Sequence, residues 1–242
     1  MIRLSVIIPI YNEEQRLPNT LKKVSEYLEK QSYEYEIIAV DDGSGDRTGN
    51  ILKESVSTVP SLRIVEIRHR GKGSAVKQGM LEAKGEILLF TDADNSTSID
   101  QVEKMFPWLS QGYGVVIGSR DVEGAVLKPP QSWFRNLVTG EGFKFLRKIL
   151  VGLWDIEDSQ CGFKAFSREA AKKVFPRSRI EQFAFDPEVL YLARKFGYKI
   201  KEIPVVWANN VHSKVNTRST VQMGFDLFLM RIRVWLGAYK TL

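Results

Sequence analysis

Residues 86–94 read Glu-Ile-Leu-Leu-Phe-Thr-Asp-Ala-Asp, so that a short apolar run ends in two carboxylates. The apolar part is typical of a buried strand. Residues i and i+2 of a strand point to the same face, which lets Asp92 and Asp94 converge on one hard cation. Mg²⁺ and Mn²⁺ prefer oxygen ligands and bring substrate phosphates with them. The stretch therefore predicts a strand that ends in a metal site; alternatively, Asp-Ala-Asp only ends a strand and caps the next helix.

Strand and helix signals alternate through the first half of the chain. Apolar runs predict five strands, at residues 4–10, 37–40, 62–67, 87–90 and 115–118. Helical spacing predicts helices at residues 13–30, 47–56 and 73–83. This alternation indicates an α/β fold with a mostly parallel, Rossmann-like sheet flanked by helices. Ligands bind beyond the carboxyl ends of strands in such folds, and the polar motifs of this chain lie there.

The composition excludes several classes of protein. The chain has 242 residues, of which 43% are hydrophobic, and this profile fits one large globular domain or two small ones. Its net charge of +6 favours anionic partners: nucleic acid, nucleotide phosphates or an anionic membrane surface. Cys161 is the single cysteine, which excludes an internal disulfide and favours a reducing compartment. No stretch approaches the roughly 18 apolar residues of a membrane-spanning helix, so we expect any membrane contact to be peripheral.

The second half is less regular. Pro129-Pro130 interrupts it, and residues 133–150 predict a basic, aromatic helix that would shape one side of the site. The last predicted helix, at residues 222–239, has an apolar stripe made of Phe225, Phe228, Leu229, Ile232, Trp235, Leu236 and Tyr239. Packing into the core is the favoured interpretation. The alternative is a helix in the membrane interface, with Arg231 and Arg233 near lipid headgroups.

Two loops combine glycine with charge where a strand gives way to a helix. Carboxylates in Asp41-Asp42-Gly43-Ser44-Gly45-Asp46 can accept hydrogen bonds from a base or a ribose, and we expect Asp42 to contact a nucleotide. Asp46 is expected to cap the following helix. Residues 68–73, Arg-His-Arg-Gly-Lys-Gly, favour phosphate through their charge and the start of a helix, or else form a solvated basic loop. They lack the spacing of a P-loop, which disfavours nucleotide hydrolysis of that kind.

Taken in order, four motifs resemble the inverting glycosyltransferases of family 2, which have the GT-A fold. They are Pro9-Ile10-Tyr11-Asn12-Glu13, Asp41-Asp42-Gly43-Ser44, Arg70-Gly71-Lys72-Gly73 and Asp92-Ala93-Asp94. The second half is similar to the dolichyl-phosphate glucosyltransferase and polyprenyl-phosphate hexose synthase group. This similarity rests on Gly118-Ser119-Arg120, on residues 158–164 and 184–188, and on the tail motifs at 207–214, 222–224 and 231–233. The resemblance implies one GT-A domain over residues 1–242, with a nucleotide-sugar half at 1–118 and an acceptor half at 119–242 that ends in an amphipathic helix.

The resemblance also implies an activity and its residues. The activity is transfer of glucose, with inversion, from UDP-glucose to a polyprenyl phosphate such as dolichyl phosphate. The nucleoside pocket would contain Pro9, Tyr11, Glu13, Asp41 and Asp42, with Lys72 nearby. Asp92 and Asp94 would hold Mg²⁺ or Mn²⁺ and the diphosphate. Arg120 and Arg135 would hold the acceptor phosphate. The sugar and acceptor side would be lined by Asp158, Gln160 and Lys214. Of these, Asp94, Arg120, Arg135 and Asp158 are the expected catalytic residues.

Two departures from the pattern stand out. His212 lies where the group usually has a glycine before Ser213-Lys214, which puts the geometry of Lys214 in question. Members of the group often carry membrane-spanning segments at one end, and this sequence has none. We therefore expect a cytoplasmic protein bound peripherally to the cytoplasmic face of a membrane, unless such a segment has been removed.

The acceptor decides which chemistry the protein needs. A lipid monophosphate, with a second pKa of about 6, is mostly dianionic at neutral pH and needs no strong base to attack. A sugar hydroxyl would need one, for which Asp158 or Asp186 is the candidate. Three alternatives therefore remain: a GDP-mannose-dependent dolichyl-phosphate mannose synthase, a family 2 transferase that acts on a hydroxyl, and a non-catalytic nucleotide-sugar or membrane-binding module. Nucleic-acid binding is not expected, because the basic residues lie beside glycine turns without a base-stacking stripe.

Overall fold

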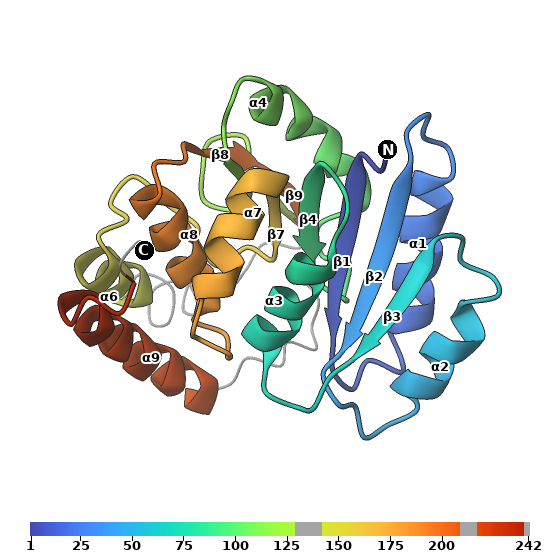
Figure 1. Cartoon of the computed structure of the whole chain (residues 1–242), viewed down its shortest axis with the longest axis horizontal. Coiled ribbons are helices and arrows are strands. Elements are labelled where there is room, and N and C mark those ends of the chain that lie inside the picture. The colour runs from blue at the N-terminus through green and yellow to red at the C-terminus, as the bar shows by residue number, and fades with distance from the viewer. Residues whose placement is uncertain (129–141, 209–216, 240–242) are drawn as a thin grey trace.

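The computed structural model describes residues 1–128, 142–208 and 217–239 of the protein. A seven-stranded sheet runs through its centre in the order β3-β2-β1-β4-β7-β5-β8, and β6 and β9 form a separate parallel pair (Figure 1). The strands are β1 Leu4–Ile10, β2 Tyr35–Asp41, β3 Leu62–Glu66, β4 Ile87–Thr91, β5 Val115–Ser119, β6 Val126–Lys128, β7 Phe163–Ser167, β8 Ile200–Pro204 and β9 Val206–Ala208. The five strands predicted for the first half are all present.

Helices cover both faces of the sheet. They are α1 Leu17–Leu28, α2 Thr48–Ser55, α3 Lys72–Glu82, α4 Phe106–Ser110, α6 Gly142–Val151, α7 Arg168–Val174, α8 Phe185–Lys195 and α9 Thr217–Trp235, with 3₁₀ turns at Ile99–Lys104 and Phe175–Arg177. Because side chains of a strand alternate between faces, β1 serves two cores. Ile7 packs with Val76 of α3 and the α7–α8 side, whereas Ile8 packs with Leu21 of α1 and the α2–α4 side. In Figure 1, α3 and α7 lie in front of the sheet and α1 lies behind it.

One strand reverses direction within the sheet. β7 pairs antiparallel with both β4 and β5, whereas the other pairings in the sheet are parallel. Neither β7 nor β8 was predicted from the sequence. The reversal brings the start of β7 next to the end of β4, with Thr91 opposite Phe163. The chain before β7 therefore reaches the edge of the sheet where β1, β2, β3 and β4 end.

The boundaries of some predicted helices differ from the structure. The helix predicted at 13–30 begins at Leu17, next to Pro18, because proline is favoured in the first turn of a helix and residues 13–16 form a turn before it. Of the helix predicted at 133–150, the structure describes α6, which begins at Gly142; residues 133–141 lie outside the described parts.

The burial predicted for the last helix is largely wrong. The buried side chains of α9 belong to Met223, Leu227 and Met230. The predicted stripe instead contains strongly exposed residues, with Trp235 at 72% and Leu236 at 78% exposure, and Phe225 and Phe228 about half exposed. Of that stripe, Tyr239 is buried as expected. The helix has apolar residues on two faces, so spacing alone could not show which face packs against the protein.

Candidate active site

The predicted site residues gather at the carboxyl edge of β1 to β4. These strands are neighbours in the sheet and run parallel, so the segments that follow them meet. This edge contains Tyr11 and Glu13 after β1, Asp41 and Asp42 at the end of β2, Lys72 at the start of α3, and Asp92 and Asp94 after β4. Residues 158–162 join them from the start of β7.

Asp92 lies directly over the backbone of Gly162. Its N–H donates to the Gly162 carbonyl at 3.1 Å. A Cβ atom added to Gly162 would lie 2.0 Å from the Asp92 carboxylate, so only glycine leaves room for this side chain. The carboxylate forms an ion pair with Lys72, whose Nζ lies 2.5 Å from Asp92 Oδ1. Asp92 is still 36% exposed and Lys72 20% exposed, so this pair remains in contact with solvent.

Asp94 is held by its own turn. Its Oδ1 accepts the backbone N–H of Ser96 at 2.9 Å. Burial raises the pKa of Asp94, and the charge of Asp92 raises it further. A cation beside both carboxylates would offset this repulsion and stabilise the ionised form of Asp94.

The chemistry of this acidic pair, Asp92 and Asp94, fits Mg²⁺ or Mn²⁺. The described part of the chain contains no group of three or more His, Cys, Asp or Glu side chains placed to hold a metal. Magnesium is often bound by one or two carboxylates and completed by water and substrate phosphates, and two protein carboxylates meet that need. Buried polar atoms without a hydrogen-bond partner also lie in the flanking loops, at Ser96 Oγ, Ser159 Oγ and Gln160 Nε2. Such atoms are costly to leave unpaired, and their position indicates a ligand.

Arg120 and Asp158 form a closed ion pair. The guanidinium approaches the carboxylate with two nitrogens, Nε at 2.7 Å and Nη2 at 2.9 Å. The backbone N–H groups of Arg120, Gln160 and Cys161 also donate to Asp158. Burial opposes ionisation of Asp158, but the charge and hydrogen bonds of Arg120 outweigh it and lower the pKa to about 2. Asp158 is therefore an ionised anchor for this loop, and Arg120 also lies over the Trp207 ring, 5.5 Å from its centre.

A second buried pair was missed in the sequence. Lys164 is fully buried within β7, and its Nζ donates to the Cys161 carbonyl and to Asp186 at 2.6 Å. Asp186 lies in the first turn of α8 and contributes to the electrostatic environment of Lys72. Asp186 had been considered only as a base for a hydroxyl acceptor. A lysine inside an otherwise apolar strand is a recognisable signal, because a buried charge needs a partner.

The nucleoside-side carboxylates are held by neighbouring loops. Asp42 accepts the backbone N–H groups of Arg70 at 2.9 Å and Gly71 at 2.8 Å, and lies 2.9 Å from His69 Nδ1. His69 stacks on Tyr11, with ring centres 4.1 Å apart. Asp42 therefore shapes the basic loop, and the paired rings form a flat surface beside it. His69 was not among the predicted site residues.

The remaining predicted residues are partnered, or lie outside the described parts. Asp41 accepts hydrogen bonds from the backbone N–H and the hydroxyl of Ser44. Glu13 forms an ion pair with Arg16 at 2.7 Å. Pro9 is buried inside β1. The predicted cap Asp46 accepts the N–H of Thr48, the first residue of α2. The structure does not describe Arg135, His212 or Lys214.

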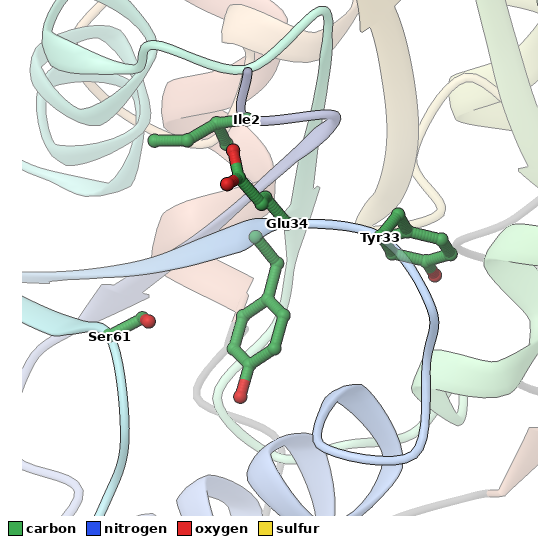
Figure 2. Close-up of a pocket in the computed structure, with 5 residues that line it drawn as sticks. Ile2, Tyr33, Glu34 and Ser61 are labelled. Atoms are coloured by element: carbon green, nitrogen blue, oxygen red, sulfur yellow. The ribbon is translucent and has the colours of Figure 1, made fainter.

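A pocket elsewhere in the molecule has no connection to these residues. Figure 2 shows it at the opposite edge of the sheet, lined by Ile2, Tyr33, Glu34, Tyr35 and Ser61. These residues lie just before or at the start of β1, β2 and β3. In the described ranges, the predicted site residues lie at the carboxyl edge of β1 to β4 and not beside this pocket, so the carboxyl edge is the candidate site.

No helix in the described ranges combines the length and apolarity that a bilayer crossing requires. Several large apolar side chains of α9 are exposed to solvent: Val221, Phe225, Phe228 and Trp235.

Comparisons with known proteins show the family and the fold of the chain. The chain is 39% identical to the dolichyl-phosphate beta-glucosyltransferase of Drosophila melanogaster, over 99% of this chain and 77% of the relative. It is also 39% identical to the human enzyme of the same name, over 98% of this chain and 78% of the relative. Among solved structures, glucosyl-3-phosphoglycerate synthase from Mycobacterium tuberculosis, in complex with Mn²⁺, uridine-diphosphate-glucose and glycerol 3-phosphate, has the same fold. The TM-score is 0.67 at 16% identity, over 98% of this chain and 80% of that one. Residues 5–175 match the profile of "Glycosyl transferase family 2", and the chain belongs to this family.

Proposed function

We propose that the protein transfers glucose from UDP-glucose to a polyprenyl phosphate such as dolichyl phosphate, with inversion at the anomeric carbon. The observation that carries this proposal is the similarity, at 39% identity over nearly the whole chain, to enzymes named dolichyl-phosphate beta-glucosyltransferase. In this proposal residues 1–118 bind the nucleotide sugar. Residues 119–242 bind the acceptor.

The donor diphosphate would lie between the acidic pair and the start of α3. Asp92 and Asp94 would hold Mg²⁺ or Mn²⁺; the M. tuberculosis enzyme of the same fold was crystallised with Mn²⁺ and UDP-glucose. When bound, such a metal stabilises the negative charge that develops on the departing nucleoside diphosphate. Lys72, at the positive end of α3, supplies a further charge for the phosphates. The stacked rings of Tyr11 and His69 offer a surface for the base.

The carboxylates of the acceptor side favour a phosphate acceptor. A hydroxyl acceptor needs a base with a pKa near neutrality. Asp158 has a pKa of about 2 and accepts hydrogen bonds from Arg120, Gln160 and Cys161, so it would be a weak base. Burial raises the pKa of Asp186, but its carboxylate is only 3% exposed and is paired with Lys164, so it is shielded from solvent. A lipid phosphate is already ionised, so the main task of Arg120 and Arg135 would be to position it.

The substrate lipid requires contact with a membrane, and the exposed face of α9 suits that contact. We define this face by Val221, Phe225, Phe228, Trp235 and Leu236, which are exposed to water. Arg231 lies against Trp235, with its guanidinium 5.3 Å from the ring centre. Aromatic side chains beside arginines are typical of helices that lie in a membrane interface. In this proposal the protein binds peripherally to the cytoplasmic face of a membrane.

Vesicle sedimentation tests the membrane contact. The double variant Phe225→Asp/Phe228→Asp should bind anionic vesicles at least about tenfold more weakly, because two apolar anchors become negative. Val56→Asp is the matched control, since Val56 is similarly exposed and α2 lies at the other end of the molecule from α9 (Figure 1). Equal binding by both variants would contradict the assignment of α9.

The activity itself is tested by the transfer of labelled sugar into lipid. The protein is incubated with polyprenyl phosphate, Mg²⁺ or Mn²⁺, and either UDP-glucose or GDP-mannose, with Asp94→Asn as the negative control. Label that enters the organic extract from UDP-glucose alone supports the proposal. Label from GDP-mannose alone would show that the donor is GDP-mannose, while the acceptor would still be the polyprenyl phosphate. If neither donor labels the lipid, the proposed transfer to a polyprenyl phosphate is wrong, and a transferase acting on a hydroxyl or a non-catalytic binding module replaces it.

A further inference from the structure

Lys72 occupies the position on Asp92 that a metal ion would use. Its Nζ lies 2.5 Å from Asp92 Oδ1, and Asp186 and Asp94 add to the negative potential around it. An ammonium and a divalent cation on the same carboxylate repel each other, and Mg²⁺ needs its oxygen ligands at about 2.0–2.1 Å in near-ideal octahedral geometry. The ammonium must therefore move away from this oxygen before a metal can bind there.

The backbone around Lys72 is fixed, so the movement belongs to the side chain. Gly71 adopts a φ of 123°, and a Cβ on it would lie 2.6 Å from Gln182. A Cβ on Gly73 would lie 2.6 Å from the Ile180 carbonyl and 2.7 Å from Phe185. The residues on both sides of Lys72 are thus packed tightly against the 180–185 segment. The lysine stem, in contrast, has four rotatable bonds and some contact with solvent.

Two other described cations of the site, Lys164 and Arg120, are held more tightly. Lys164 is completely buried between Cys161 and Asp186. Arg120 is held by two hydrogen bonds from its guanidinium to Asp158. Among the described residues, Lys72 forms its ion pair with Asp92, and it lies at the start of α3, where a phosphate is favoured. A diphosphate bound at that helix end carries more negative charge than the Asp92 carboxylate, so it attracts the ammonium more strongly.

We propose that Lys72 is an internal counter-ion of Asp92, which leaves it for the donor diphosphate and so makes metal binding depend on the nucleotide. Without nucleotide, the ammonium neutralises Asp92 and competes with the metal. With nucleotide, it moves to the phosphates and leaves Asp92 open to the metal. Lys72 is then a positioning residue that sets the order of binding. The inference rests on the proposed function, because it assumes a nucleoside-diphosphate donor and a metal.

Mn²⁺ binding measured by electron paramagnetic resonance tests the inference without relying on turnover. Free Mn²⁺ is titrated with wild-type protein and with Lys72→Met, each with and without UDP, after correction for Mn²⁺ bound to UDP in solution. Wild type should bind Mn²⁺ at least about tenfold more tightly with UDP than without it. Lys72→Met should bind Mn²⁺ alone at least about tenfold more tightly than wild type does, and UDP should enhance its binding less.

Two further variants separate the role of the charge from general effects. Lys84→Met removes an exposed lysine just beyond α3, and it should leave both Mn²⁺ affinities unchanged. Lys72→Arg keeps the charge and should keep Mn²⁺ binding weak without UDP. Should Lys72→Met fail to fold, as seen from its thermal unfolding, Lys72→Gln takes its place with the same expectation.

Two results would overturn the inference. One is equal Mn²⁺ affinity of wild type and the neutral Lys72 variant in the absence of UDP. The other is the absence of any Mn²⁺ binding by wild type with UDP present. The same wild-type preparation is also assayed for transfer of labelled glucose into lipid. If transfer occurs, the proposed function stands even when the inference about Lys72 fails, so failure of the inference can be told apart from failure of the proposed function.

Discussion

Two of the carboxylate–cation pairs in the site, Arg120–Asp158 and Lys72–Asp92, are alike in distance and different in burial. Asp158 is 3% exposed and receives hydrogen bonds from Arg120, Gln160 and Cys161 in addition to its ion pair. Asp92 is 36% exposed, and its carboxylate is paired with Lys72. A buried pair with every lone pair satisfied holds its surroundings in place, because separating it leaves a charge without solvent. An open pair can exchange its partner at low cost, which suits the metal-binding role proposed for Asp92.

The largest expected effect comes from removing a charge beside the open pair. Asp94→Asn should lower glucose transfer by more than about 100-fold, because the developing charge of the leaving group loses its stabilisation. The thermal unfolding temperature should change little. The measurement is labelled transfer beside a calorimetric scan, and near-normal transfer would remove Asp94 from the metal site.

Breaking the closed pair should instead affect folding. Asp158→Asn leaves the charge of Arg120, which is only 24% exposed, without its counter-charge, and it should lower the free energy of unfolding by about 3 kcal/mol. Urea denaturation measures this loss. A change below about 1 kcal/mol would show that the pair is as exchangeable as the open one.

The same pair gives a dependence on pH. The folded pKa of Asp158 is about 2, below its ordinary value of 3.8, so its ionised form stabilises the fold above pH 4. This contribution, about 2 kcal/mol, is lost as the pH falls from 4 towards 2. Asp158→Asn should show a correspondingly smaller loss of stability over that range. Identical pH profiles for the two proteins would contradict the depressed pKa.

A smaller effect is expected from displacing the open carboxylate. In Gly162→Ala the new Cβ would lie 2.0 Å from Asp92 Oδ2, so the side chain must move, and transfer should fall by about tenfold. Gly49→Ala is the matched control, because its Cβ would meet only an ordinary contact at 3.6 Å. It should keep full activity and gain a few tenths of a kcal/mol in α2. Equal activities would show that Asp92 need not occupy this position.

The smallest effect is expected at an exposed pair of similar shape. Arg194 approaches both oxygens of Asp155 at 2.7 Å, but the two side chains are 40% and 70% exposed. Arg194→Ala should therefore change the free energy of unfolding by less than about 1 kcal/mol. A loss as large as that of Asp158→Asn would mean that burial is not what separates the two classes of pair.

Much of the first half could be predicted from the sequence, because its signals are local. An apolar run followed by Asp92 and Asp94 places a strand end and two carboxylates without knowledge of the rest of the chain. The same holds for Asp42, which follows its strand directly. The partners of these residues are not local: the contact of Asp92 with Gly162 depends on a strand pairing that the sequence does not display.

The second half was harder for physical reasons. Lys164 lies in a strand whose antiparallel direction could not be inferred from its length or composition. Asp158 was predicted as a catalytic residue, and whether it contacts substrate stays a prediction; its partners show an anchoring role that only coordinates reveal. The apolar residues of α9 exceed what one buried face can hold, so periodicity did not identify the face that packs.

The antiparallel pairing of β4 with β7 also sets the order in which the site can form. Thr91 pairs with Phe163, so the loop between them must close before Asp92 meets Gly162. Long-range pairings carry a large entropic cost and tend to form late in folding. During synthesis the ribosome delivers the acidic pair well before residues 158–162. A nascent chain can thus complete the parallel strands β1 to β4 while the candidate site still lacks residues 158–162, and on the proposed function it would become active only after β7 has paired with β4.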